Sequence, residues 1–228
     1  MILKKDGSSP IHAIIIIVFS AILLQLIGRY YAFSVFKIGS HFYSLWVILR
    51  IVIPVVLIMI LKIPLSSIGL GLPEIDRKTG KGLLAILILL ILAFIGIYFF
   101  QDYIKFYSNL FHSPGGSKLS RFCNFMIFTS STLTGWEFLH RGFLLMGIFY
   151  VLVKRENIPE DSAKRIAICI VCVFEVVFHF IKPGIEALGL LIGSPILSYI
   201  AFRTKSIWLP FLIHLFVELL FIFVLLLH

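Results

Sequence analysis

The sequence predicts an all-α protein: a polytopic transmembrane helical bundle with about seven or eight spans. Of its 228 residues, 60% are hydrophobic and only 14% are charged, whereas soluble domains carry about 25% charged residues. The apolar residues also gather into runs that approach the roughly 20 residues needed to cross a bilayer. These observations exclude a soluble enzyme, a disordered segment and a small disulfide-stapled domain.

Six apolar runs, bounded by polar or charged turns, predict clear transmembrane helices, and a seventh run is less uniform. The first run follows Lys4 and Lys5 and has no small-residue cleavage site after it, so we expect a retained span and not a signal peptide. In chain order, the six clear runs lie at 11–28, 42–62, 82–100, 134–153, 166–181 and 207–227, and the seventh lies at 185–202.

The segment 101–133 is the ambiguous part of the chain. It begins with amphipathic sequence, contains a Ser-Pro-Gly-Gly turn at 113–116, and ends with the short apolar run Phe122–Phe128. Such a pattern is compatible with an interfacial or re-entrant helix, or with an eighth span. We expect no separate soluble domain, so the whole chain, 1–228, forms one integral membrane domain.

The formal net charge of +9 is interpreted as a topology signal. With seven spans and a cytoplasmic N-terminus, twelve of the 20 Lys and Arg residues fall on the cytoplasmic side and six on the other. An excess of cytoplasmic Lys and Arg is the usual pattern of membrane proteins. The sequence therefore predicts a cell-membrane protein with an inside N-terminus, the lipid bilayer as a partner, and no nucleic-acid partner.

Four of the 11 acidic residues fall within or beside predicted spans. A charge at the bilayer centre costs at least about 2.5–3.5 kcal/mol, so such residues face the bundle interior and mark sites. In three spans an acid and a base are four residues apart, which places both on one helix face. We expect these pairs to converge on one polar cavity. They are Glu137 with Arg141, Glu175 with His179, and His214 with Glu218, and the fourth acid is Glu186.

Three short motifs carry these residues, in the order Trp136-Glu137-Phe138-Leu139-His140-Arg141, Glu175-Val176-Val177-Phe178-His179 and His214-Leu215-Phe216-Val217-Glu218. Over roughly residues 120–220 the chain resembles the CAAX protease and bacteriocin-processing family (CPBP, or Abi). This family of intramembrane glutamic endopeptidases is related to the type II CAAX prenyl endopeptidase. Its pattern is Glu-Glu-x-x-x-Arg, then Phe-x-x-x-His, then His-x-x-x-Asn/Asp, on three transmembrane helices.

The resemblance implies a bacterial peptidase whose catalytic core, 120–220, hydrolyses a membrane-associated peptide or protein without a cofactor. It implies that the first glutamate of the family motif and His179 activate a water. Glu137 would pair with Arg141, and His214 with the residue at 218 would stabilise the oxyanion. A buried carboxylate suits general-base work, and donors placed near the carbonyl stabilise the charge that develops there.

Three residues depart from the family pattern, and they leave alternatives open. Trp136 stands where the family has its first glutamate, Glu175 replaces the phenylalanine, and Glu218 replaces the asparagine. Either another acid supplies the base, with Glu137 changing its role and Glu175 or Glu186 assisting His179, or the protein is a catalytically impaired immunity or scaffold factor. Intramembrane His and Glu also suit a transporter or proton relay, but the order of the motifs argues against that function.

Purely structural roles would also explain several of these intramembrane polar residues. Glu137 and Arg141 can form a purely structural ion pair, and Glu186 can be a first-turn carboxylate that interacts with a helix dipole. His140 precedes Arg141 by one residue and is expected to face another direction. Zinc is considered because His and Glu are ligands, but without a His-Glu-x-x-His motif no metal site is expected.

Overall fold

The computed structural model describes residues 9–35, 41–97, 104–105, 118–180 and 184–227, and within these residues all regular structure is helical. This confirms the all-α class. A π-helical segment, Phe138–Met146, joins α5 to α6 in one continuous helix, and a short 3₁₀ turn covers Leu65–Ser67. The helices are α1 (Pro10–Val35), α2 (His41–Ile60), α3 (Arg77–Ile97), α5 (Lys118–Glu137), α6 (Gly147–Arg155), α7 (Glu160–His179), α8 (Gly184–Thr204) and α9 (Trp208–Leu227).

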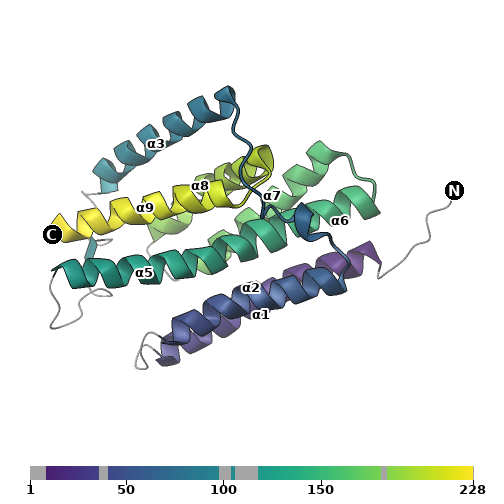
Figure 1. The fold of residues 1–228 in the computed structure, drawn as a ribbon, viewed down its shortest axis with the longest axis horizontal. Helices are drawn as coiled ribbons and strands as arrows, with labels where there is room; N and C mark the ends of the chain where they lie inside the picture. The colour runs from purple at the N-terminus through teal and green to yellow at the C-terminus, as the bar shows by residue number, and fades with distance from the viewer. Residues whose placement is uncertain (1–8, 36–40, 98–103, 106–117, 181–183, 228) are drawn as a thin grey trace.

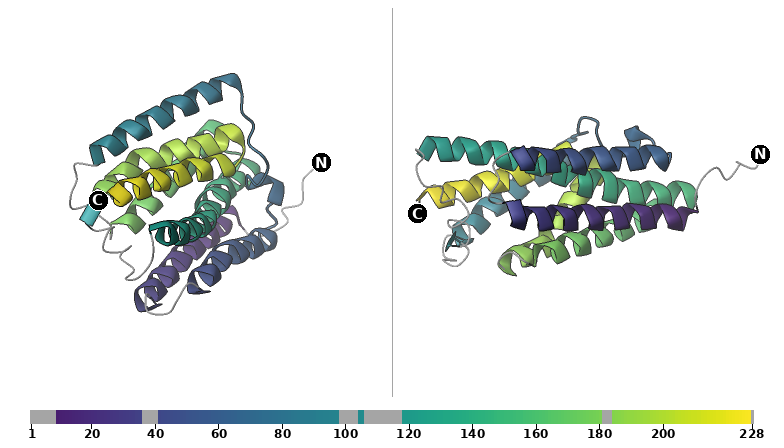
Figure 2. Two further views of the ribbon diagram at one scale, coloured as in Figure 1. Left: turned by 60° about the vertical axis from the view of Figure 1, so that its left-hand side comes forward. Right: turned by 90° about the horizontal axis from the view of Figure 1, so that it is seen from below.

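The helices lie roughly parallel or antiparallel to one long axis, which is horizontal in Figure 1. The helices α1 and α2 lie together on one side of the bundle, and α3 lies on the opposite side, beyond α8 and α9 (Figures 1 and 2). Between these sides runs the continuous helix of α5, the π-helical segment and α6. Its π-helical segment contacts α1, α2, α7 and α8, so residues of this segment can meet partners from both halves of the chain.

The π-helical segment is the most enclosed part of the molecule that the structure describes. All nine of its residues are buried. Helical segments of this type are rare and are frequently found at functional sites. A Cβ added at Gly142 would lie 3.4 Å from both the Ile68 carbonyl oxygen and the Phe138 ring. The loop after α2 therefore packs directly against the segment at this position.

Hydrophobic clusters hold the bundle together, and the larger one includes most of the π-helical segment. The larger one joins α1, α2, α6 and α7 through small and aliphatic side chains such as Ala13, Ile17 and Ile148. A smaller one joins α8 to α9 through Leu197, Ile200, Leu209 and Ile213, with α3 packed against it.

The apolar character of the helices fits an integral membrane protein. Among the described residues, three helical stretches are long and apolar enough to cross a membrane: Pro10–Gly28, Thr129–Arg155 and Glu186–Thr204. Two shorter apolar stretches, Leu49–Ile60 and Trp208–Phe221, accompany them. Large apolar side chains such as those of Ile11, Phe19 and Leu92 point outward and are exposed in the isolated chain, as expected for a surface that contacts lipid.

The structure shows that the second half of the ambiguous segment 101–133 is helical. Residues 118–133 form the first turns of α5, which continues into the buried π-helical segment. The apolar run Phe122–Phe128 is therefore neither a separate re-entrant helix nor an eighth span. Helix continuity decides this, because no turn separates the run from Glu137. The predicted turn at 113–116 lies outside the described residues.

One end of the bundle, which we call the basic end, comprises the loop 61–76, the α6–α7 turn and the α8–α9 turn. The backbone N–H of Glu74 donates to the Thr204 carbonyl at 3.0 Å, and the Arg155 guanidinium contacts the Leu61 carbonyl. The Lys and Arg residues assigned to the inside therefore gather at this end. Those within the described part are Lys62, Arg77, Lys78, Lys81, Lys154, Arg155, Lys164, Arg165, Arg203 and Lys205.

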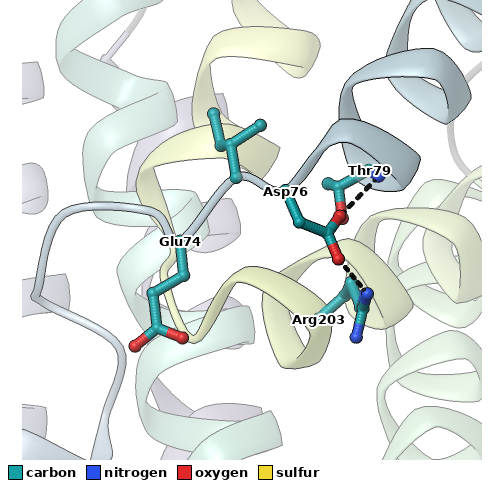
Figure 3. Close-up of a pocket in the computed structure, with 5 residues that line it drawn as sticks. Glu74, Asp76, Thr79 and Arg203 are labelled. Atoms are coloured by element: carbon teal, nitrogen blue, oxygen red, sulfur yellow. Dashed lines mark hydrogen bonds and ion pairs between the residues drawn. The ribbon is translucent and has the colours of Figure 1, made fainter.

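The basic end also carries an open pocket lined by Glu74, Ile75, Asp76, Thr79 and Arg203. Asp76 pairs with Arg203 and accepts a 2.7 Å hydrogen bond from the backbone N–H of Thr79, whereas Glu74 points away from this pair (Figure 3). The carboxylate of Glu74 instead lies 2.9 Å from the Lys205 ammonium. These contacts tie the start of α3 to the α8–α9 turn.

Candidate functional site

Glu137, the acid of the first motif, links α5 to α9. It is the last residue of α5 and is 1% exposed. Its Oε1 accepts a 2.7 Å hydrogen bond from Nδ1 of His214, and its Oε2 lies 3.5 Å from Nε of Arg141, one helical turn further on. The first and third motifs thus meet through one buried carboxylate.

Arg141 lies between two carboxylates. Besides Glu137, its guanidinium pairs directly with Glu175 of α7, and both Arg141 and Glu175 are almost completely buried. A buried charge is tolerated only when it is paired and hydrogen-bonded. The ion pair within the first motif is therefore part of a larger cluster that also includes the second motif.

Trp136 and Glu175, two of the departures from the family pattern, contact each other. The indole Nε1–H of Trp136 donates to Glu175 Oε1 at 3.1 Å. In the family pattern position 136 is a glutamate and position 175 is a phenylalanine. In this chain an indole and a carboxylate meet at these two positions, across the interface between α5 and α7. The carboxylate missing from the first motif thus has a counterpart one helix away.

His179, at the end of α7, faces a carboxylate that comes from α8. Its Nδ1–H donates to the backbone carbonyl of Glu175 at 2.8 Å, which leaves Nε2 as the acceptor nitrogen. This Nε2 lies 3.6 Å from Oε1 of Glu186, a first-turn residue of α8. The Glu175 side chain contacts Arg141 and Trp136 through its Oε1, and its backbone carbonyl accepts the hydrogen bond from the His179 ring.

The site has an accessible side and an enclosed side. The side chains of His214 and Glu186 are each 18% exposed, and that of His179 is 9% exposed. Glu218 lies one turn after His214 on α9 and interacts with it electrostatically. The imidazoles of His179 and His214 and the carboxylate of Glu186 are thus the partly exposed groups of the cluster, whereas Glu137 and Glu175 are buried.

The expectation that His140 faces away from the site is wrong. His140 is completely buried, its ring stacks against Trp136 with centroids 4.0 Å apart, and its Nδ1 lies 4.0 Å from Glu175 Oε1. The prediction failed because the π-helical segment is surrounded by helices on several sides, so adjacent positions both meet polar partners. Sequence reasoning also missed Gln25 of α1 and Arg50 of α2, which contact this part of the site.

The structure separates the polar cluster from the open pocket of the basic end. Arg203 in that pocket is 17 residues beyond Glu186 on α8, a distance of about 25 Å at 1.5 Å per residue. Within the described part of the chain, no group of three or more His, Cys, Asp and Glu side chains is arranged to hold a metal ion. The cluster itself presents imidazoles, carboxylates and the guanidinium of Arg141.

These features define a class: an integral membrane protein with a buried cluster of Glu, Arg and His between its helices. Residues 119–220 match the family described as type II CAAX prenyl endopeptidase Rce1-like, which confirms the resemblance indicated by the motifs. The family implies a protease, and thus a hydrolase of peptide bonds. No curated protein and no solved structure shows a significant match to the chain.

Proposed function

We propose that this chain is an intramembrane endopeptidase that hydrolyses a peptide bond of a membrane-associated peptide or protein. The observation that carries the proposal is the pair formed by His179 Nε2 and Glu186 Oε1, 3.6 Å apart. It lies beside the cluster of Glu137, Arg141 and His214, and the edge-on contact of the Trp136 and His179 rings, 5.1 Å between centroids, links the two groups. The match to a protease family supports the reaction class.

In the proposed reaction His179 and Glu186 activate the attacking water. Since His179 Nδ1–H donates to the Glu175 carbonyl, the lone pair of the neutral ring lies on Nε2, which can accept a hydrogen bond from a water held between it and Glu186. Glu186 accepts the proton as the water oxygen bonds to the carbonyl carbon. When the carbon–nitrogen bond breaks, Glu186 returns this proton to the leaving amine. Proton transfer by a positioned side chain typically contributes about 10²–10⁴-fold to the rate.

His214 is proposed to stabilise the oxyanion. Its Nδ1–H donates to Glu137 at 2.7 Å, and a carboxylate in that position balances the charge of an imidazolium. The Nε2–H of this imidazolium would then donate to the carbonyl oxygen as negative charge develops on it, which is the task of an oxyanion hole. Glu218 assists as a second acid near His214, in its protonated, hydrogen-bond-donating form.

Arg141 and Glu175 are proposed to position these groups. Glu175 fixes His179 through its backbone carbonyl, and Arg141 holds Glu137 and Glu175 together. We further propose seven spans in a bacterial cell membrane with a cytoplasmic N-terminus, because the Lys and Arg residues gather at one end of the bundle. The cytoplasmic side is then the basic end.

Cleavage assays with site variants test this proposal. The purified chain in lipid nanodiscs is incubated with a pool of fluorophore–quencher peptides, with and without a prenyl group. Glu186→Gln and His179→Ala are each expected to lower the cleavage rate at least about 100-fold. Glu160→Gln, an exposed acid in the first turn of α7, is the matched control and is expected to cleave normally. Cleavage that survives both site substitutions would overturn the proposal.

A non-catalytic immunity or scaffold factor is the second candidate. It is favoured by Trp136, because an indole stands where the resemblance places the first motif glutamate, and its N–H donates to Glu175, one of the two acids that could replace that glutamate. Under this function the cellular phenotype of the chain would persist in His179→Ala and His214→Ala. Under the peptidase function both variants would lose the phenotype together with cleavage.

A further inference from the structure

A row of polar side chains enters the site from α1 and α2, outside the segment that matches the family. Arg50 Nη2 donates to Gln25 Oε1 at 2.6 Å, and Gln25 Nε2 lies 3.1 Å from His140 Nε2. The row continues through His140 Nδ1, 2.7 Å from the backbone carbonyl of Trp136. Gln25, Arg50 and His140 are at most 2% exposed. We call these three residues the N-terminal relay.

The relay allows one assignment of its protons. Arginine has donors only, so the side-chain oxygen of Gln25 must face Arg50, and the amide NH₂ must face His140. Nε2 of His140 is then an acceptor. Its Nδ1 faces a carbonyl oxygen, which accepts only, so the ring hydrogen must lie on Nδ1. Each contact in the row joins a donor to an acceptor when His140 is neutral with its hydrogen on Nδ1.

Arg50 also contacts Trp136 directly. Its guanidinium carbon lies 5.2 Å from the centroid of the indole ring, within the range of a cation–π interaction. The indole N–H of the same ring donates to Glu175. The ring of Trp136 therefore lies between a guanidinium and a carboxylate, with His140 stacked against it.

The buried charges of the described residues balance when Arg50 is included. Two guanidiniums, Arg50 and Arg141, and two carboxylates, Glu137 and Glu175, are each at most 2% exposed. Without Arg50, these four groups would carry one more negative than positive charge, which the imidazolium of His214 beside Glu137 would have to balance. A buried excess charge is costly, so Arg50 contributes to the counter-charge for the two buried carboxylates.

We propose that Gln25, Arg50 and His140 are positioning residues of the site: they hold the Trp136 indole against Glu175 and balance its charge, and thereby align His179. The alignment for cleavage rests on the proposed peptidase function, whereas the His140 tautomer and the charge coupling do not. A failure of the peptidase proposal is thus distinguishable from a failure of this one.

The tautomer of His140 is the first test. The full chain is labelled with ¹⁵N-histidine in lipid bilayers, and the His140 signals are assigned by their loss in His140→Asn. We expect a neutral ring with its hydrogen on Nδ1. In Gln25→Glu a carboxylate faces Nε2, so we expect Nε2 to become protonated. Gln25→Leu offers no acceptor and is expected to keep the Nδ1–H ring. A wild-type ring protonated at Nε2 would overturn the proposal, as would an unchanged ring in Gln25→Glu.

The charge coupling is the second test, measured as the apparent unfolding temperature in detergent micelles. Arg50→Met and Glu175→Gln each leave one uncompensated buried charge, and we expect each to lower this temperature. The double variant restores balance, so its loss is expected to be smaller than the sum of the two single losses. The exposed pair Lys164 and Glu160, 3.5 Å apart, is the control, and its Met and Gln variants are expected to add without coupling. Additive losses for Arg50 and Glu175 would overturn the counter-charge role.

Discussion

Two arginine–carboxylate pairs in this protein have the same chemistry and opposite environments. Arg141 and Glu175 meet inside the bundle with side chains 1% and 0% exposed, whereas Arg203 and Asp76 meet at the basic end with side chains 45% and 54% exposed. Separating the second pair returns both groups to water, but separating the first leaves a charge in an apolar interior. The free energy by which an ion pair stabilises the folded protein therefore depends on what each partner would contact if the pair were broken.

The largest expected effect is the loss of the buried guanidinium. In Arg141→Met, Glu137 and Glu175 would lose their shared partner, and removal of one partner from a buried pair costs about 3–5 kcal/mol. We expect a strong fall of the apparent unfolding temperature of the purified chain in detergent. Arg203→Met is the matched control at the basic end, and a fall of similar size there would contradict the contrast between the two environments.

The contact between positions 136 and 175 gives the next largest effect. Trp136→Glu restores the family glutamate but places a third carboxylate beside Glu175, and an uncompensated buried charge again costs about 3–5 kcal/mol. In the double variant Trp136→Glu with Glu175→Phe, one carboxylate and one ring remain, and we expect most of the lost stability to return. The measurement is the same unfolding temperature. A double variant no more stable than Trp136→Glu alone would show that the two positions are independent.

The fold and much of the site could be predicted from the sequence for one physical reason. In an apolar chain, hydropathy marks the helices, and a charged residue is conspicuous because it needs a buried partner. Thus seven apolar runs correspond to helices, and Glu137, Arg141, Glu175 and His214 are brought together. The structure of segment 118–133 was harder to predict, because Ser and Thr interrupt its apolar residues and leave no apolar run of spanning length.

The remaining parts of the site depend on tertiary packing. Gln25 is uncharged and lies in no motif, so the sequence of α1 does not identify it as a site residue. Its contact with His140 in the folded structure does. Nothing in a spacing of four residues distinguishes a carboxylate from a backbone carbonyl as the partner of His179. Short-range spacing predicts which residues share a helix face, but the neighbouring helices decide which atoms pair.

The smallest expected effect lies at Asp76, at the exposed end of the comparison. Thr79, whose backbone N–H donates to the carboxylate, and then the charges of Arg203 and Lys78, lower the pKa of Asp76. A lowered pKa means that the folded state favours the carboxylate over the acid. The resulting stabilisation is present above the ordinary aspartate pKa of about 3.9, and it is lost as the pH falls through the lowered value.

Asp76→Asn isolates this contribution. The variant cannot ionise, so its apparent unfolding temperature should lie slightly below that of the wild type at neutral pH, and the difference should shrink as the pH falls below about 3.9. The Asp76 side chain is exposed, so water and salt screen its interactions, and added salt should reduce the difference further. If this difference in unfolding temperature grew on acidification, the ionised carboxylate of Asp76 would oppose folding. That result would contradict the weak stabilisation expected of an exposed ion pair at the basic end.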